Sequence, residues 1–163
     1  MSVQLDVTKP NEAEIRESAL VSDIYSQIAK YFDETRGYLW SWVRDVIDTI
    51  PAGSRILDIG CGNGWLLSQL NAKVKCGIDL SPSMVDVAKK TCPEATVIQA
   101  DIESRLDLKK IKGLGLFDYI ILSDTLAFLD DIEVGLSHVR KLCGPSTRVI
   151  LSRYNQLWEP VLK

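Results

Sequence analysis

The chain has 163 residues, of which 46% are hydrophobic and 25% charged, proportions typical of one soluble domain with its own core. The formal net charge of -3 argues against binding to a nucleic-acid backbone, since such proteins usually carry a basic face. No apolar run could cross a membrane, the N-terminus has no signal-peptide pattern, and the four cysteines form no C-x-x-C pair. We therefore expect a cytoplasmic protein with free thiols and no metal site.

The first fifty residues predict helices. Apolar residues recur at three- and four-residue steps between 24 and 32 and again between 39 and 50. The stretch PAGS at 51–54 then has the composition of a turn. We expect residues 1–50 to form an N-terminal helical cap on a core built from residues 51–163, within one domain overall.

From residue 55 onward, short apolar runs alternate with helical patterns. The helical patterns cover 65–70, 82–90, 103–110 and 131–142; Ser81 and Pro82 suit the start of the second, and Gly144 the end of the last. The strands read RILDIG, VKCGIDL, ATVIQAD, FDYIILSD and TRVILSR. Continuous apolar strands separated by helices predict an α/β fold, an open doubly wound, mostly parallel sheet with helices on both faces.

Four successive strands end at or near an aspartate, namely Asp58, Asp79, Asp101 and Asp124. Ligands of such sheets bind at the carboxyl ends of the strands, so these acids should line one crevice. The glycines of the stretch GCGNG at 60–64 fit neither the dinucleotide pattern G-x-G-x-x-G nor a P-loop. An acidic crevice beside a glycine loop favours a ligand with hydroxyls and positive charge, which describes S-adenosylmethionine.

Four segments in order resemble the class I S-adenosylmethionine-dependent methyltransferases. LDIGCGNG resembles their first motif, and GIDLSPSMVDVAKK, VIQADIE and FDYIILSDTLAFLDD look like the next three. The resemblance implies the strand order 3-2-1-4-5, S-adenosylmethionine as cofactor with S-adenosylhomocysteine as product, and methyl transfer to a small molecule.

Carried over residue by residue, the resemblance first implies a site for the methionine part and the ribose. Gly60, Cys61 and Gly62 would contact the cofactor through their backbone, and Asp58 would orient their loop. Ser123 would offer its carbonyl to the ammonium group of the cofactor.

The resemblance also implies a site for the adenosine part. Asp79 would accept both ribose hydroxyls, and Leu80 and Met84 would pack on the adenine ring. Asp101 and the backbone N–H of Ile102 would hydrogen-bond the ring.

Several of these positions have a simpler structural interpretation. Tyr25 and Tyr31 either close over the methionine end of the cofactor or belong to the face of a helix in the core. Met84 either contacts adenine or packs its own helix, and His138 is expected to be structural or exposed. No residue belongs to a recognisable catalytic-base motif.

The resemblance implies two further strands beyond the fifth, and the sequence lacks these strands 6 and 7. A bare apolar edge is rarely exposed, so we expect a second copy or a missing C-terminal segment to cover strand five. The alternative function is a non-catalytic or truncated module that binds S-adenosylmethionine or a partner. A nicotinamide-dependent oxidoreductase fits poorly because the glycine spacing is wrong.

Overall fold

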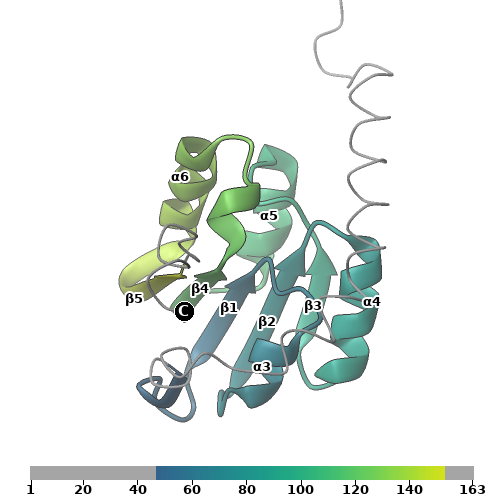
Figure 1. The fold of residues 1–163 in the computed structure, drawn as a ribbon. Coiled ribbons are helices and arrows are strands. Elements are labelled where there is room, and N and C mark those ends of the chain that lie inside the picture. The colour runs from purple at the N-terminus through teal and green to yellow at the C-terminus, as the bar shows by residue number, and fades with distance from the viewer. Residues whose placement is uncertain (1–46, 153–163) are drawn as a thin grey trace, which may run out of the picture.

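The computed structural model describes residues 47–152, which form a sheet flanked by helices (Figure 1). Tyr25, Tyr31 and nearly all of the expected helical cap lie outside these residues. The elements in chain order are β1 (Arg55–Ile59), α3 (Trp65–Gln69), β2 (Val74–Asp79), α4 (Pro82–Thr91), β3 (Thr96–Gln99), α5 (Arg105–Gly113), β4 (Phe117–Ser123), the 3₁₀ helix η1 (Thr125–Phe128), α6 (Ile132–Leu142) and β5 (Cys143–Ser152).

All five strands are parallel and lie in the order β3-β2-β1-β4-β5, which confirms the predicted topology. β1 is central, and its Leu57 pairs with Cys76 of β2 on one side and Ile120 of β4 on the other. Because parallel strands share a direction, the turns after β1, β2, β3 and β4 meet at one edge of the sheet.

Alternate residues of each strand face two separate cores. One core joins strand residues such as Leu57, Ile78 and Ile120 to α5 and α6. The other joins Ile56 and Ile121 to α3 and α4, with Ile47 and Ile50 packed against it. The apolar runs of β1, β2 and β4 are therefore buried on both faces (Figure 1).

Polar caps fix where the helices begin. As predicted, the Ser81 hydroxyl caps α4 by accepting from the Met84 N–H at 3.4 Å, and Pro82 occupies the first turn. The helix predicted over 103–110 lies slightly later in the chain, at Arg105–Gly113. Ser104 caps its start, and Glu103 belongs to the preceding loop. Asp131 caps α6 in the same way.

The transition from α6 to β5 differs from the prediction. Gly144 does not end the helix: α6 stops at Leu142 and β5 begins at Cys143. The pairing with β4 then shifts between Phe117 and Tyr119, and the Thr147 hydroxyl spans the irregularity by donating to the Phe117 carbonyl at 2.6 Å.

Within residues 47–152, β3 and β5 are the two edges of the sheet. Val149 and Leu151 of β5 are 40% and 49% exposed. They lie on the same face of the sheet as their β4 partners Ile120 and Leu122, which α5 and α6 cover. That a second copy or a further segment covers this edge stays a prediction. None of the helices described has the length and apolar character needed to cross a membrane.

Candidate functional site at the carboxyl edge of the sheet

The predicted site residues that fall within the described part of the chain gather at the carboxyl edge of the sheet. β1 carries Asp58 near its end, β2 ends at Asp79, and β4 ends at Ser123. Asp101 and Ile102 follow the end of β3 after one intervening residue. The parallel topology brings together residues that are up to 65 positions apart in the sequence, from Asp58 to Ser123.

The glycine loop, residues 60–64, is held by its own backbone. The N–H groups of Gly60 and Cys61 both donate to the Ile78 carbonyl, at 2.8 and 3.0 Å. The Gly62 N–H donates to Asp79 Oδ2 at 2.8 Å. Since these three donors are used inside the protein, the predicted backbone contacts to a ligand would be made by carbonyl oxygens.

Asp79 is held in place by two backbone groups. Oδ2 accepts from Gly62 N–H, and Oδ1 accepts from Ser81 N–H at 2.9 Å. Burial raises the pKa of this carboxyl, and these hydrogen bonds oppose the rise. Each carboxylate oxygen has a second lone pair, so Asp79 can also accept hydroxyl groups from a ligand.

Asp58 lies inside the sheet, and its side chain is only 2% exposed. Its Oδ1 atom has no hydrogen-bond partner among the described residues. Burial, and then the charge of Asp79, raise the pKa of Asp58 to about 8. An unpaired buried oxygen beside a second acid suits a cationic ligand, because a positive charge would lower the raised pKa of Asp58 and stabilise both groups as carboxylates.

The loop after β3 is tied to its surroundings at several points. Asp101 Oδ1 accepts from the Glu103 N–H at 2.7 Å. The Ile102 carbonyl lies 2.7 Å from Nδ1 of His138, which is buried in α6. This contact confirms the structural interpretation of His138 and rules out an exposed position.

The two predicted adenine-packing residues differ in exposure. Leu80 is 59% exposed, beside the end of β2, and offers an apolar surface. Met84 is 8% exposed and belongs to the buried residues of α4. The roles of both residues in packing on adenine stay predictions.

The segment after β4 contacts the glycine loop through Thr125, which the sequence analysis missed. The Thr125 hydroxyl donates to the Ile59 carbonyl at 2.7 Å, with the Ser123 carbonyl at 3.3 Å. A Cβ on Gly60 would lie 2.5 Å from the Thr125 oxygen, so the first glycine makes room for this threonine. The position just after the fourth strand is the only signal that could have indicated it.

The described residues do not favour metal or thiol chemistry. Residues 47–152 contain no group of three or more His, Cys, Asp or Glu side chains that could hold a metal ion. Cys61 is buried, and this burial raises the pKa of its thiol well above the ordinary range. The described part of the site is therefore a group of acids around a glycine loop.

Comparisons with known proteins agree with this description. A family model described as "Methyltransferase domain" matches residues 30–161. The tRNA (carboxymethyluridine(34)-5-O)-methyltransferase of Xenopus tropicalis is 33% identical over 101 residues, 60% of this chain and 16% of that protein. The ubiquinone biosynthesis O-methyltransferase of Xanthomonas axonopodis pv. citri is 33% identical over 110 residues, 65% of this chain and 45% of that protein.

Among solved structures, a TehB-like SAM-dependent methyltransferase from Corynebacterium glutamicum superposes with a TM-score of 0.62 at 25% identity. That match covers 82% of this chain and 72% of the other. The chain thus matches less than half of the length of each of the two curated relatives and most of this solved structure.

Proposed function

Because the chain belongs to the class I S-adenosylmethionine-dependent methyltransferases, we propose that it binds this cofactor at the carboxyl edge of its sheet and methylates a small-molecule acceptor. The observation that carries the proposal is the placement of two acids around one glycine loop. Asp79 is oriented by Gly62 and Ser81, and Asp58 keeps an unpaired buried oxygen.

The residues present fit the cofactor in charge and in shape. S-adenosylmethionine carries two positive groups, a sulfonium and an ammonium, and two ribose hydroxyls that need acceptors. Asp79 offers acceptors for the hydroxyls, and the acids at this edge stabilise positive charge. A Cβ on Gly62 would have no neighbour within 4 Å, so the backbone there is open to a ligand.

Methyl transfer from this cofactor is a direct displacement by the acceptor on an already activated methyl group. The protein's main task is therefore to hold the acceptor in line with the methyl group. The fixed glycine loop and the segment after β4 lie where that alignment would be set. We assign no catalytic base to this chain.

The proposed acceptor atom is oxygen, since both curated relatives described above are named for methylation at oxygen. A small molecule is favoured over RNA by the charge at this edge of the sheet. Acidic residues crowd the edge that holds the site, where they would repel a phosphate backbone. They are Asp79, Asp101, Glu103, Asp124, Asp130 and Asp131.

A tRNA acceptor is the second candidate, supported by the name of the Xenopus relative. The two candidates differ in a simple assay with tritium-labelled S-adenosylmethionine and bulk tRNA. The proposal expects no tritium in tRNA and no binding of tRNA stronger than about 100 μM at physiological salt. Stoichiometric labelling of the tRNA would refute the small-molecule acceptor and support tRNA as the acceptor.

Calorimetric titration with S-adenosylmethionine and S-adenosylhomocysteine tests the cofactor site itself. We expect micromolar affinity for the unchanged chain, and a loss of at least about tenfold for Asp79→Ala, which removes the ribose acceptor. Asp86→Ala, a change on the exposed side of α4, is the matched control and should bind normally. No binding by the folded, unchanged chain would overturn the proposal.

A further inference from the structure

A short segment between β4 and α6 lies against the two loops that form the proposed cofactor site. We call residues 125–131 the acceptor-side segment and residues 101–104 the adenine loop. We propose that Glu103 is a positioning residue that couples the adenine loop to the acceptor-side segment, so that a bound cofactor orders the surface that receives the acceptor. This inference rests on the proposed function.

Glu103 makes the central contact. Its Oε1 accepts from the Asp131 N–H at 2.6 Å and its Oε2 accepts from the Asp130 N–H at 3.1 Å. Both oxygens of one carboxylate therefore hold consecutive backbone amides, and charge-assisted hydrogen bonds of this kind are stronger than neutral ones. The carboxylate also lies at the N-terminus of α6, where the helix dipole favours negative charge.

A second hydrogen bond joins the adenine loop to α6. Nδ1 of His138 donates to the Ile102 carbonyl at 2.7 Å, since a carbonyl can only accept. Gly135 allows close packing here, because a Cβ at that position would lie 2.7 Å from Leu129 Cδ1 and 3.9 Å from Glu103 Cγ. The adenine loop is thus joined to both the start and the second turn of α6.

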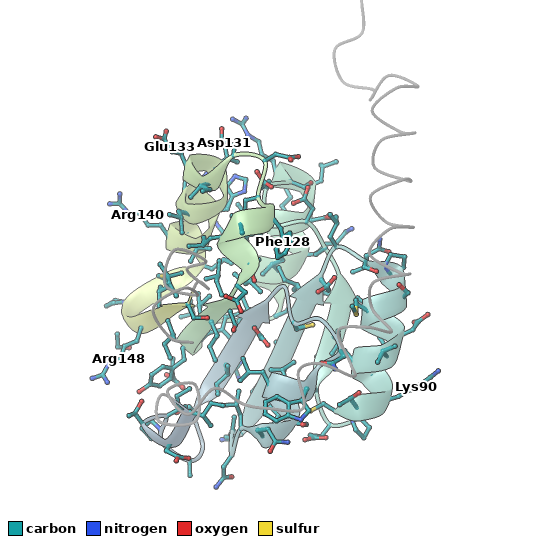
Figure 2. All side chains as sticks on the ribbon, in the orientation of Figure 1. Lys90, Phe128, Asp131, Glu133, Arg140 and Arg148 are labelled. Atoms are coloured by element: carbon teal, nitrogen blue, oxygen red, sulfur yellow. The ribbon has the colours of Figure 1, made fainter. Side chains whose placement is uncertain are left out.

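The acceptor-side segment is only partly buried, and Leu126 and Leu129 anchor it to the core. η1 contributes no buried residue, and Phe128 is 56% exposed. The segment begins after Asp124, whose φ of 57° is unusual for a residue other than glycine. Figure 2 shows Phe128 on η1 and Asp131 at the start of α6.

The two ends of the segment are held by different parts of the cofactor site. Thr125 fixes its start to the end of β1, beside the glycine loop, and Glu103 fixes its end to the adenine loop. Ser123 is predicted to contact the amino-acid end of the cofactor, so the residues after it would lie beside the transferred methyl group. A ligand that stabilises both loops would therefore stabilise the segment, and the acceptor would bind best after the cofactor.

Hydrogen exchange of the full chain tests this coupling with 5′-methylthioadenosine, which has the adenine, ribose and thioether but no amino-acid part. In the unchanged chain we expect exchange to slow at the adenine loop and, by at least about fivefold, in the acceptor-side segment. In Glu103→Gln the adenine loop should still slow, whereas the acceptor-side segment should slow by less than about twofold. The amide of Gln has one acceptor oxygen, and its NH₂ group would face a backbone N–H.

Glu133→Gln makes the same chemical change on the exposed first turn of α6 and should behave as the unchanged chain does (Figure 2). Glu103→Asp, which withdraws the carboxylate by one methylene, tests the same contacts should the amide variant fail to fold. If methylthioadenosine leaves the adenine loop unchanged, the comparison is made with S-adenosylhomocysteine and read at residues 128–131.

Two results would overturn the coupling alone. One is equal slowing of the acceptor-side segment in Glu103→Gln and in the unchanged chain. The other is slowing of the adenine loop with no slowing of the segment in the unchanged chain. A different result, no slowing at residues 60–64, 79–81 or 101–104 with either compound, would refute the proposed cofactor site, and the inference with it.

Discussion

Asp58 differs from the other acids of the site because it lies within the central strand and is shielded from water. Its pKa of about 8 means that the folded protein retains a proton that the unfolded chain loses near pH 3.8. The native state therefore binds more protons than the unfolded state between these two values. By linkage, this residue's contribution to the free energy of unfolding falls as the pH rises through that window and levels off above it.

The Asp58→Asn variant tests this linkage, since asparagine cannot titrate. The free energy of unfolding of the unchanged chain should fall between about pH 5 and pH 8 more steeply than that of the variant, by on the order of 1 kcal/mol per pH unit. Urea denaturation at several pH values measures both slopes. Asp86→Asn, on the exposed side of α4, should keep the unchanged slope. Equal slopes for the unchanged chain and Asp58→Asn would contradict a buried proton at this site.

At the scale of elements, Gly64 controls how closely α3 approaches α4. It precedes α3 with a φ of 75°, and a Cβ there would lie 2.9 Å from the backbone Cα of Ala88. Because the clash is with backbone atoms, no rotation of a side chain can relieve it. The third glycine of the loop therefore has a packing role, separate from contact with a ligand.

Gly64→Ala should lower the free energy of unfolding by about 2–4 kcal/mol, the sum of left-handed strain and overpacking. Chemical denaturation monitored by circular dichroism measures the loss. Gly113→Ala is the matched control, because φ there is not positive and no atom lies within 4 Å of the added Cβ. A loss at Gly64 no larger than at Gly113 would show that α3 and α4 separate at little cost.

Local patterns in the sequence predicted the elements well. The strands were visible as short apolar runs, and the start of α4 as Ser81 followed by Pro82. The errors came where a non-local contact decides the outcome. Thr147 bonds to Phe117, 30 positions away, and this contact accompanies the irregular start of β5 that replaced the predicted stop at Gly144.

The placement of the candidate site could be predicted for those residues that lie at or near the ends of strands. Asp58, Asp79 and Asp101 could be identified because each belongs to a motif at the end of an apolar run. Glu103 and Thr125 could not, since their partners lie 27 or 28 and 66 positions away, at Asp130, Asp131 and Ile59. Such contacts exist only after the sheet order has placed β4 beside β1.

At the scale of the whole sheet and its helices, charge within residues 47–152 is separated along the strand direction. Acids gather at the carboxyl edge of the sheet, while the last turns of three helices carry basic residues, namely Lys89, Lys90, Lys110, Lys112, Arg140 and Lys141. Figure 2 shows Asp131 and Glu133 at the start of α6, with Arg140 further along the helix and Lys90 on α4. This separation follows the helix dipoles, with Arg105 at the start of α5 as an exception.

The acidic edge should bind a cation better than a neutral analogue of the same shape. S-adenosylmethionine has a net charge of +1 at neutral pH, and S-adenosylhomocysteine has none. Raising the salt from about 20 to 200 mM should weaken the affinity for the first by about threefold and change that for the second less. Calorimetry at several salt concentrations measures both. An equal loss for the two compounds would contradict an electrostatic preference for the sulfonium.

The central position of β1 also affects how the chain folds during synthesis. Ile56 of β1 pairs with Lys75 of β2, but its other neighbour, Tyr119 of β4, is 63 residues away. At about 5–20 residues per second, a ribosome needs about 3–13 s to supply that partner. During this interval the edge of β1 that will pair with β4 has no partner. A molecular chaperone then has its best opportunity to protect the nascent chain.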